Sequence, residues 1–284
     1  MLAATLHLVA CMAVFSMLER LWPSSSPHKW WRRPLLIDLC SWLILPLAVG
    51  AGITLAVLTT GALVARGHRW DWFVQAQTVV GVVPLFIQIL VAFISVDFIS
   101  YWIHRAYHRF PFLWSFHVMH HTSEKVDWLS TLRLHPLSQM IDTALTSGTL
   151  LMAGFSLKAV IVANAVIGFC AVVAHANVSW TFGPFRHVFV SPLFHHWHHA
   201  RHQGDSDSGR ARNFGAALSI WDRIFGTSIH ANTRPTRFGA EDAPVQNLWN
   251  LIFQPLRFCL RGKQRKPEAL AARPSSRRSK QRFI

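Results

Sequence analysis

The chain has 284 residues, of which 51% are hydrophobic and 14% charged. Ordinary soluble proteins carry about 25% charged residues, so this balance excludes a typical soluble domain and indicates an integral membrane protein. The formal net charge of +15 does not indicate nucleic-acid binding, because many basic residues lie beside apolar runs or within residues 257–284. Basic residues in such places are typical of topology signals and anionic-lipid contacts.

The first region, residues 1–81, is predicted to hold N-terminal transmembrane spans. The apolar run Leu2–Leu18 has no basic start and no small-residue cleavage site, so we expect a retained span and not a signal peptide. A second apolar run, Leu35–Ala65, is long enough to cross a bilayer. The basic loop 20–33 is expected in the cytoplasm, which places residues 66–77, a Trp-rich turn, outside.

A third apolar run leads into a pair of histidines. A helix from Val82 to His108 would measure about 40 Å against about 30 Å of hydrocarbon, so its last turns should protrude into the cytosol. Asp97, Tyr101 and His104 share one stripe of this helix with His108. Because an acid within a span is costly without a partner, Asp97 is either a helix–helix hydrogen-bonding group or an acceptor that orients a ligand imidazole.

Three clusters repeat spacings at which histidines share one helix face. They are His104 and His108; His117, His120 and His121; and His195, His198 and His199. Since residues three and four apart stack on one face, each cluster is expected to aim two or three imidazoles at a common point. Eight ligands at these offsets predict a metal site. None of the four cysteines has C-x-x-C spacing, so no disulfide framework or thiolate site is indicated.

Residues 143–174 form a further apolar stretch, which could be one span or a hairpin of two short helices. The third cluster can reach the same metals as the first two only if the chain enters and leaves on the same side. We therefore expect a membrane hairpin over about residues 136–174, which returns His135 and His175 to the face that carries the clusters. A basic C-terminal tail, residues 231–284, is expected to follow, on the same cytoplasmic face as the metal site.

The number of histidines bears on the number of metals. Neutral imidazole suits zinc, copper, iron and nickel, so the ligands alone do not name the ion. A structural zinc needs about four ligands and a catalytic zinc about three, so the eight to ten histidines of this region indicate two ions. Paired redox iron that activates dioxygen would need such a set. At the mouth of a membrane bundle, it implies a lipid substrate delivered from the bilayer.

These motifs resemble, in order and spacing, the fatty acid hydroxylase / sterol desaturase superfamily of membrane di-iron enzymes. The resemblance covers about residues 82–230. The matching text is Asp97-x-x-x-Tyr101-x-x-His104-Arg105-x-x-His108, Leu113-Trp114-x-x-His117-x-x-His120-His121, Arg133-x-His135-Pro136, His175-Ala176-Asn177, Pro192-x-x-His195-x-x-His198-His199, Asn213-Phe214-Gly215 and Trp221-Asp222-Arg223.

The resemblance implies an all-α integral membrane helical bundle with a cytosolic histidine-rich di-metal cap. It implies two iron ions, dioxygen and electrons from a separate reductase or carrier, with His135 and His175 as additional ligands. Zinc is possible in a purified sample, because zinc binds such ligands more tightly than ferrous iron. No catalytic residue beyond the ligands is expected. Asp97, Tyr101, Asn213 and Asp222 are candidates for a supporting layer around them.

The sequence therefore predicts a lipid hydroxylase acting on a fatty acyl, sterol or other membrane lipid. Desaturation at the same site is the alternative, because the histidine pattern does not distinguish the two reactions. A non-catalytic metal-binding membrane protein is a remote alternative, since the spans hold few of the acidic and Met residues expected along a metal path. The remaining histidines are not expected to be ligands: His7, His28, His68, His187, His196, His202 and His230.

Overall fold

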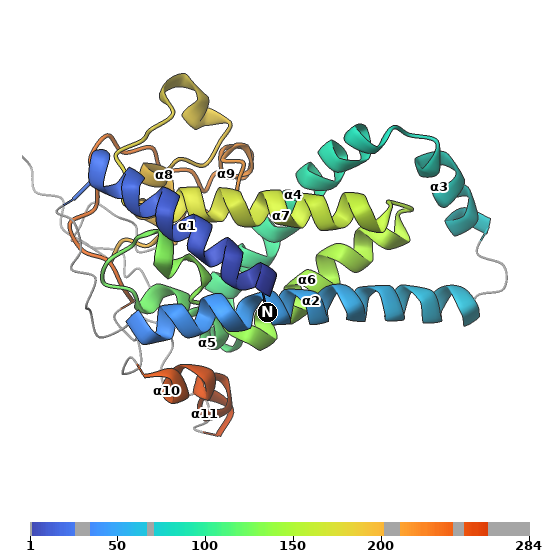
Figure 1. The fold of residues 1–284 in the computed structure, drawn as a ribbon, viewed down its shortest axis with the longest axis horizontal. Helices are drawn as coiled ribbons and strands as arrows, with labels where there is room; N and C mark the ends of the chain where they lie inside the picture. The colour runs from blue at the N-terminus through green and yellow to red at the C-terminus, as the bar shows by residue number, and fades with distance from the viewer. Residues whose placement is uncertain (1, 26–34, 67–70, 202–210, 241–246, 261–284) are drawn as a thin grey trace, which may run out of the picture.

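The computed structural model describes residues 2–25, 35–66, 71–201, 211–240 and 247–260 (Figure 1). In these residues the fold is helical, and the only β pairing consists of isolated bridges, such as the one between Phe189 and Leu218. The prediction of an all-α fold is therefore confirmed. Three helices, α2, α4 and α7, are long and apolar enough to cross a membrane, with mean hydropathies of 2.1, 1.9 and 2.2.

The N-terminal half contains α1 (Leu2–Leu21), α2 (Leu35–Arg66), α3 (Asp71–Gly81) and α4 (Leu85–Arg109). Two features differ from expectation. A helix, α3, occupies most of the expected Trp-rich turn. The third span begins at Leu85 and not at Val82, because Pro84 disfavours a helical residue before it and caps α4.

Two antiparallel helices, α6 (Pro136–Met152) and α7 (Leu157–His175), occupy the second apolar stretch. They are joined by a tight turn in which Gly154 has a φ of 89°. A Cβ at Gly154 would lie 2.6 Å from the carbonyl oxygen of Ala76 in α3, so only glycine fits this contact. Helix α6 packs along α2, and α7 packs along α4. The chain therefore enters and leaves this pair at the same end of the bundle (Figure 1).

A fully buried ion pair joins two segments of the chain at the histidine-bearing end of the bundle. Arg133, which follows the short 3-10 helix η2 (Trp128–Leu132), contacts Asp38 near the start of α2 at 2.6 Å. Both side chains have no exposed surface. Nearby, the indole of Trp42 donates to the carbonyl oxygen of Leu129 at 2.9 Å. These bonds attach the segment between α5 (Pro111–His117) and α6 to the start of α2.

The C-terminal part contains helices within the region expected to be a basic tail. Residues after α9 (Ile220–Ile224) were expected to lead into a basic tail from residue 231, yet they include α10 (Leu248–Ile252) and α11 (Gln254–Leu260). Leu251 of α10 is fully buried in a cluster with Ile37 and Met119, and α11 packs against α5 (Pro111–His117). Apolar burial of this kind holds the segment on the bundle. Residues 241–246 and 261–284 of the basic tail lie outside the described residues.

Candidate metal centre

Nine buried or half-buried histidines converge in two neighbouring groups. Within each group, one nitrogen atom per side chain lies within 4.8 Å of the others. The first group is His104, His108, His117, His121 and His198, and the second is His120, His175, His195 and His199. The rings of His121 and His199, one from each group, stack with centroids 4.4 Å apart. The two groups therefore share one enclosure.

The two groups keep the first sequence cluster, His104 and His108, together and divide the second and third. Histidines four apart stay together, as with His117 and His121, whereas His120 turns into the second group. The third cluster divides in the opposite sense: His195 and His199 lie in the second group, and His198 lies in the first. A step of four residues rotates a helical side chain by about 40° and a step of three by about −60°, so the odd member of each cluster can reach the neighbouring point. Each cluster thus aims two imidazoles at one point, and the third member of the second and third clusters reaches the other group.

Close contacts between ring nitrogens run through the second group. The Nε2 atom of His175 lies 3.1 Å from the Nε2 atoms of both His120 and His195, and that of His195 lies 3.1 Å from that of His199. In the first group, the Nε2 atoms of His198 and His121 are also 3.1 Å apart. Two nitrogens bound to one ion at about 2.1 Å and near right angles would be about 3 Å apart, so this spacing suits ligands of one ion.

Backbone carbonyls determine which ring nitrogen faces inward. The Nδ1 atom of His104 donates to the carbonyl oxygen of Phe214 at 2.8 Å, and that of His198 donates to Arg212 at 2.7 Å. His175 donates from Nδ1 to Ala171 at 2.8 Å. A neutral imidazole that donates through Nδ1 keeps a lone pair on Nε2, which is the atom that can bind a metal.

Other buried ring nitrogens have no protein partner. In the described structure, the Nε2 atoms of His104, His108 and His117 make no hydrogen bond. A buried polar atom without a partner is costly, and a metal ion would remove that cost. The residues present therefore fit the metal that the histidine pattern predicts.

The enclosure favours the neutral form of its histidines. Outside the spanning helices, the pKa values of six of them are well below the ordinary value, chiefly because burial removes water from the charged form and secondly because neighbouring histidines would repel it. They are His117, His120, His121, His195, His198 and His199. Since a metal binds the unprotonated ring, these shifts keep the groups ready for metal near neutral pH.

A left-handed residue lies between the two carbonyls that orient the first group. Asn213 has a φ of 59° and is completely buried. Its side-chain amide donates to the carbonyl oxygens of Phe194 and Ile229 at 2.9 and 3.0 Å and accepts from the backbone N–H of Ile229 at 2.7 Å. Asn213 therefore holds the turn whose neighbouring carbonyls, those of Arg212 and Phe214, bind His198 and His104.

Two carboxylates support the same turn without contacting a histidine. Asp222 accepts from the backbone N–H groups of Phe214 and Gly215, both at 2.8 Å. Asp97 accepts from the N–H groups of Ala217 and Leu218 and from the indole of Trp221 at 2.8 Å. The bond from Trp221 of α9 is a helix–helix hydrogen bond, as one of the two alternatives for Asp97 expected, and none of its three partners is a ligand imidazole. Burial raises the pKa of Asp222 to about 6, against the lowering effect of its hydrogen bonds.

Tyr101 belongs to this supporting layer. Its hydroxyl lies 2.9 Å from Thr227 Oγ1, which in turn donates to Asp222 at 2.6 Å. Tyr101 is therefore linked to the turn at Asn213 through Thr227 and then Asp222.

Comparison with known proteins bears on residues 89–227, which match the family model described as fatty acid hydroxylase. All nine grouped histidines lie within these residues. The chain belongs to the fatty acid hydroxylase family. The chain is 27% identical over 241 residues to the ornithine lipid hydroxylase OlsE of Rhizobium tropici, a match that covers 80% of this chain and 67% of that protein.

Two further relatives match over shorter lengths. The human alkylglycerol monooxygenase is 33% identical over 137 residues, which cover 48% of this chain and 29% of that protein. The fatty acid hydroxylase vlmA of Lecanicillium sp. is 32% identical over 152 residues, which cover 47% of this chain and 40% of that protein. The match spans less than half the length of these two relatives. No solved structure matches the chain.

His135, a ligand implied by the superfamily resemblance, is not brought into either group in this member of the fatty acid hydroxylase family. Its Nδ1 atom accepts from the backbone N–H of Leu137 at 3.2 Å, and its Nε2 atom donates to the carbonyl oxygen of Ile252 at 3.0 Å. Both ring nitrogens are therefore engaged, and His135 attaches α10 to the start of α6.

His187, His196 and His230 also lie outside both groups. His196 is fully buried with its Nε2 atom 3.4 Å from the carbonyl oxygen of His175, and His187 contacts His230. His28, His68 and His202 lie outside the described residues.

Tyr107 and Asp142 form a contact that the sequence analysis missed. The ring of Tyr107 stacks on His117 with centroids 5.1 Å apart, and its hydroxyl donates to Asp142 in α6 at 2.8 Å. The signal was present, since Asp142 is an acid within an apolar stretch and such residues need a partner.

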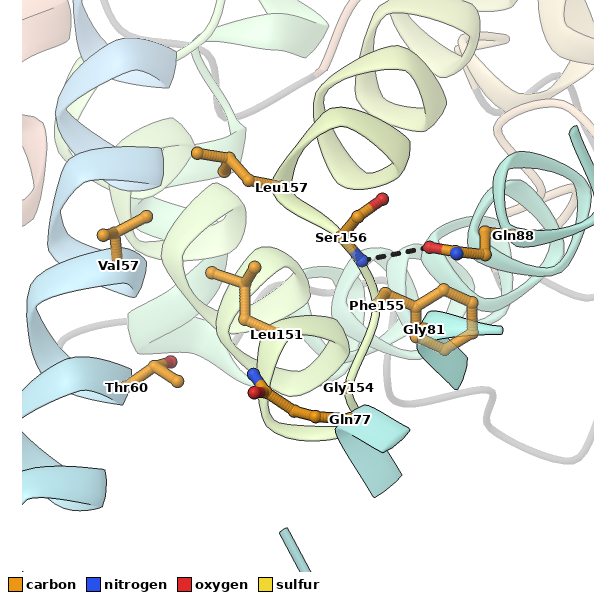
Figure 2. Close-up of a pocket in the computed structure, with 10 residues that line it drawn as sticks. All are labelled: Val57, Thr60, Gln77, Gly81, Gln88, Leu151, Gly154, Phe155, Ser156 and Leu157. Atoms are coloured by element: carbon orange, nitrogen blue, oxygen red, sulfur yellow. Dashed lines mark hydrogen bonds between the residues drawn. The ribbon is translucent and has the colours of Figure 1, made fainter. Parts of the chain in front are cut away.

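A pocket of about 400 Å³ lies beside the turn between α6 and α7 (Figure 2). It is lined by Leu157, where α7 begins, whereas His175 is at the other end of that helix. Its lining comes from α2, α3, the start of α4 and the turn between α6 and α7, and includes Val57, Gln77 and Gln88. Gln88 accepts from the backbone N–H of Ser156 at 3.2 Å. The pocket contains no grouped histidine, so it is separate from the candidate metal centre.

Replacement of Asn213 by glycine tests the turn. Glycine tolerates the φ of 59° but removes the three side-chain hydrogen bonds, so the two carbonyls should lose their positions while the backbone remains unstrained. We expect metal affinity about 10- to 100-fold weaker, measured by competition with a chelator. The control is Asn164→Ala, which removes a half-buried amide on α7 away from the histidines and should leave affinity unchanged. Unaltered metal affinity in Asn213→Gly would show that the Asn213 side chain does not position the carbonyls that orient His198 and His104.

Proposed function

We propose that the chain is a membrane lipid hydroxylase in which each histidine group holds one iron ion. The observation that carries this proposal is the convergence of nine histidines in two adjacent groups at one end of an apolar helical bundle. The family match and the hydroxylase and monooxygenase names of its relatives favour an oxidoreductase.

In this proposal the first group binds one ion and the second group the other. Bound iron supplies the redox chemistry with which dioxygen is reduced, one oxygen atom entering a C–H bond of the lipid and the other leaving as water with two protons and two electrons. The chain contributes the enclosure: it keeps the imidazoles neutral, orients them through the carbonyls of Arg212, Phe214 and Ala171, and excludes water. A separate reductase or electron carrier is proposed as the source of the electrons.

A lipid substrate fits the position of the site. His104 and His108 lie in the last turns of α4, and His175 ends α7, so two apolar helices lead directly to the two groups. A substrate in the bilayer could reach the metals from the side of these helices. The names of the relatives indicate that ornithine lipid and alkylglycerol are used by those proteins.

We propose that the metal end of the bundle and the C-terminus lie on the cytoplasmic face. The basic residues of loop 20–33 and of the tail support this orientation. Reporter fusions at Ile284 and within residues 71–77 are expected to report opposite sides of the membrane, with Ile284 in the cytoplasm. The same reading at both points would contradict the proposed topology.

Single histidine replacements test the ligand assignment. His120→Ala and His198→Ala each remove a member of one group, and we expect each variant to lose lipid oxidation and to hold fewer metal ions than wild type, which should hold two. Metal analysis after iron-replete expression measures this directly. Zinc in the sample would not contradict the proposal, because zinc competes for such ligands.

His196→Ala is the matched control, since it removes the same side chain from the same short helix, α8 (Pro192–His198). His196 is buried, so its loss should lower the unfolding temperature while both ions remain bound. If His196→Ala lost metal as completely as His198→Ala, the grouping would be wrong.

Comparative lipid mass spectrometry tests the reaction. Cells with the active protein should contain a lipid heavier by about 16 mass units than its counterpart in cells that carry His198→Ala. A loss of about 2 mass units would instead indicate desaturation. An unchanged lipid profile together with two bound ions would indicate a metal-binding protein without this activity.

A further inference from the structure

Four basic side chains from three segments gather outside the histidine enclosure. The cationic cluster consists of Arg186 and His187 in η3 (Gly183–His187), Arg223 in α9, and His230. The rings of His187 and His230 lie with centroids 4.9 Å apart, and Arg223 donates to the carbonyl oxygen of His187 at 3.3 Å. The pKa of His230 is lowered by burial and then by the positive charges of His187, Arg186 and Arg223.

No acid balances this cluster within the described part of the chain. Arg186 donates to the side-chain oxygen of Asn232 at 3.3 Å, which is a neutral partner. His230 contacts Ser228 at 2.8 Å, and the buried Nδ1 atom of His187 has no hydrogen-bond partner in the described structure. Basic groups held together without a counter-charge attract an anion.

Exposed apolar side chains border the cationic cluster. Phe185 and Ile224 are 65% and 60% exposed, and each is the sequence neighbour of an arginine of the cluster. Phe189, at 44% exposure, follows in the same segment. Aromatic and aliphatic side chains beside arginines are typical of a surface that lies in the headgroup region of a bilayer.

The position of α9 on α4 supports contact with lipid. Trp221 packs on Phe98 with ring centroids 5.0 Å apart, and Phe225 packs on Trp102 at 4.8 Å. Phe98 lies eleven residues before the end of α4 at Arg109, which corresponds to about 16 Å along the helix axis. Helix α9 is therefore held against the flank of a candidate spanning helix and not beyond its end.

We propose that the cationic cluster binds the anionic headgroup of a bilayer lipid, with the lipid's acyl chains against Phe185, Phe189 and Ile224. The arginines supply donors for a phosphate, and the two histidines extend the same face. An acidic protein would match the charge but not the exposed apolar side chains, so a lipid is the occupant that accounts for both features.

The test uses the full-length protein purified in detergent and titrated with phosphatidylglycerol or phosphatidylcholine, with native mass spectrometry of the bound lipid. We expect tighter binding of phosphatidylglycerol. The double variant Arg186→Gln/Arg223→Gln should weaken that binding about tenfold or more, whereas Arg186→Lys/Arg223→Lys should retain most of it. Phe185→Ser, a change at an exposed position, should weaken binding of both lipids without lowering the unfolding temperature.

A matched control removes the same charge elsewhere. Arg66→Gln/Lys158→Gln changes two exposed residues, at the end of α2 and the start of α7, and should leave the preference for phosphatidylglycerol intact. Glycerol phosphate, which lacks acyl chains, should bind at least about tenfold more weakly than the lipid.

Three results would overturn the proposal: no preference for phosphatidylglycerol, an equal loss in the control variant, or glycerol phosphate binding as tightly as the lipid. Binding of a poly-glutamate peptide in place of the lipid would assign the surface to a protein partner and would also overturn it.

Discussion

The geometry of the histidine enclosure depends on one turn of backbone. The carbonyl groups on either side of Asn213 bind the Nδ1 protons of His198 and His104, so the directions of two imidazoles are determined by a residue with a φ of 59°. A left-handed conformation costs a residue other than glycine about 1 kcal/mol or more. The three hydrogen bonds of the Asn213 side chain offset this cost.

The supporting layer explains how buried acids can serve a metal site without touching it. Asp222 and Asp97 accept backbone N–H groups from the segment that follows Asn213, so they keep the loop, and through it the carbonyls, in place. Asp97 also joins this loop to α4, which carries His104. The same helix therefore supplies a member of the first group and holds the segment that orients it.

Helical spacing correctly indicated that the histidines form a centre that fits metal, but it did not predict how they are grouped. The clusters were correctly expected to lie close together, but His120 and His198 cross between groups. A sequence pattern describes the phase of one helix, whereas the point that a side chain reaches depends on where neighbouring helices stand. His135 illustrates the same limit. Its place in the motif suggested a metal ligand. Its Nε2 atom instead donates a hydrogen bond to the carbonyl oxygen of Ile252 in α10, a helix that the sequence did not predict.

By itself, the sequence determined the all-α class, the apolar helices and a histidine-rich centre that fits metal, because these features depend on local hydropathy, helical period and side-chain chemistry. It also indicated the hairpin through topological parity. Only the tertiary structure decided which histidines share a group, that Asp97 and Asn213 act on a loop, and that α10 and α11 fold back on the bundle. These outcomes depend on contacts between segments that lie far apart in the sequence. Asp97 and Ala217, for example, are 120 residues apart. Packing of the whole bundle determines such contacts, and no local pattern encodes them.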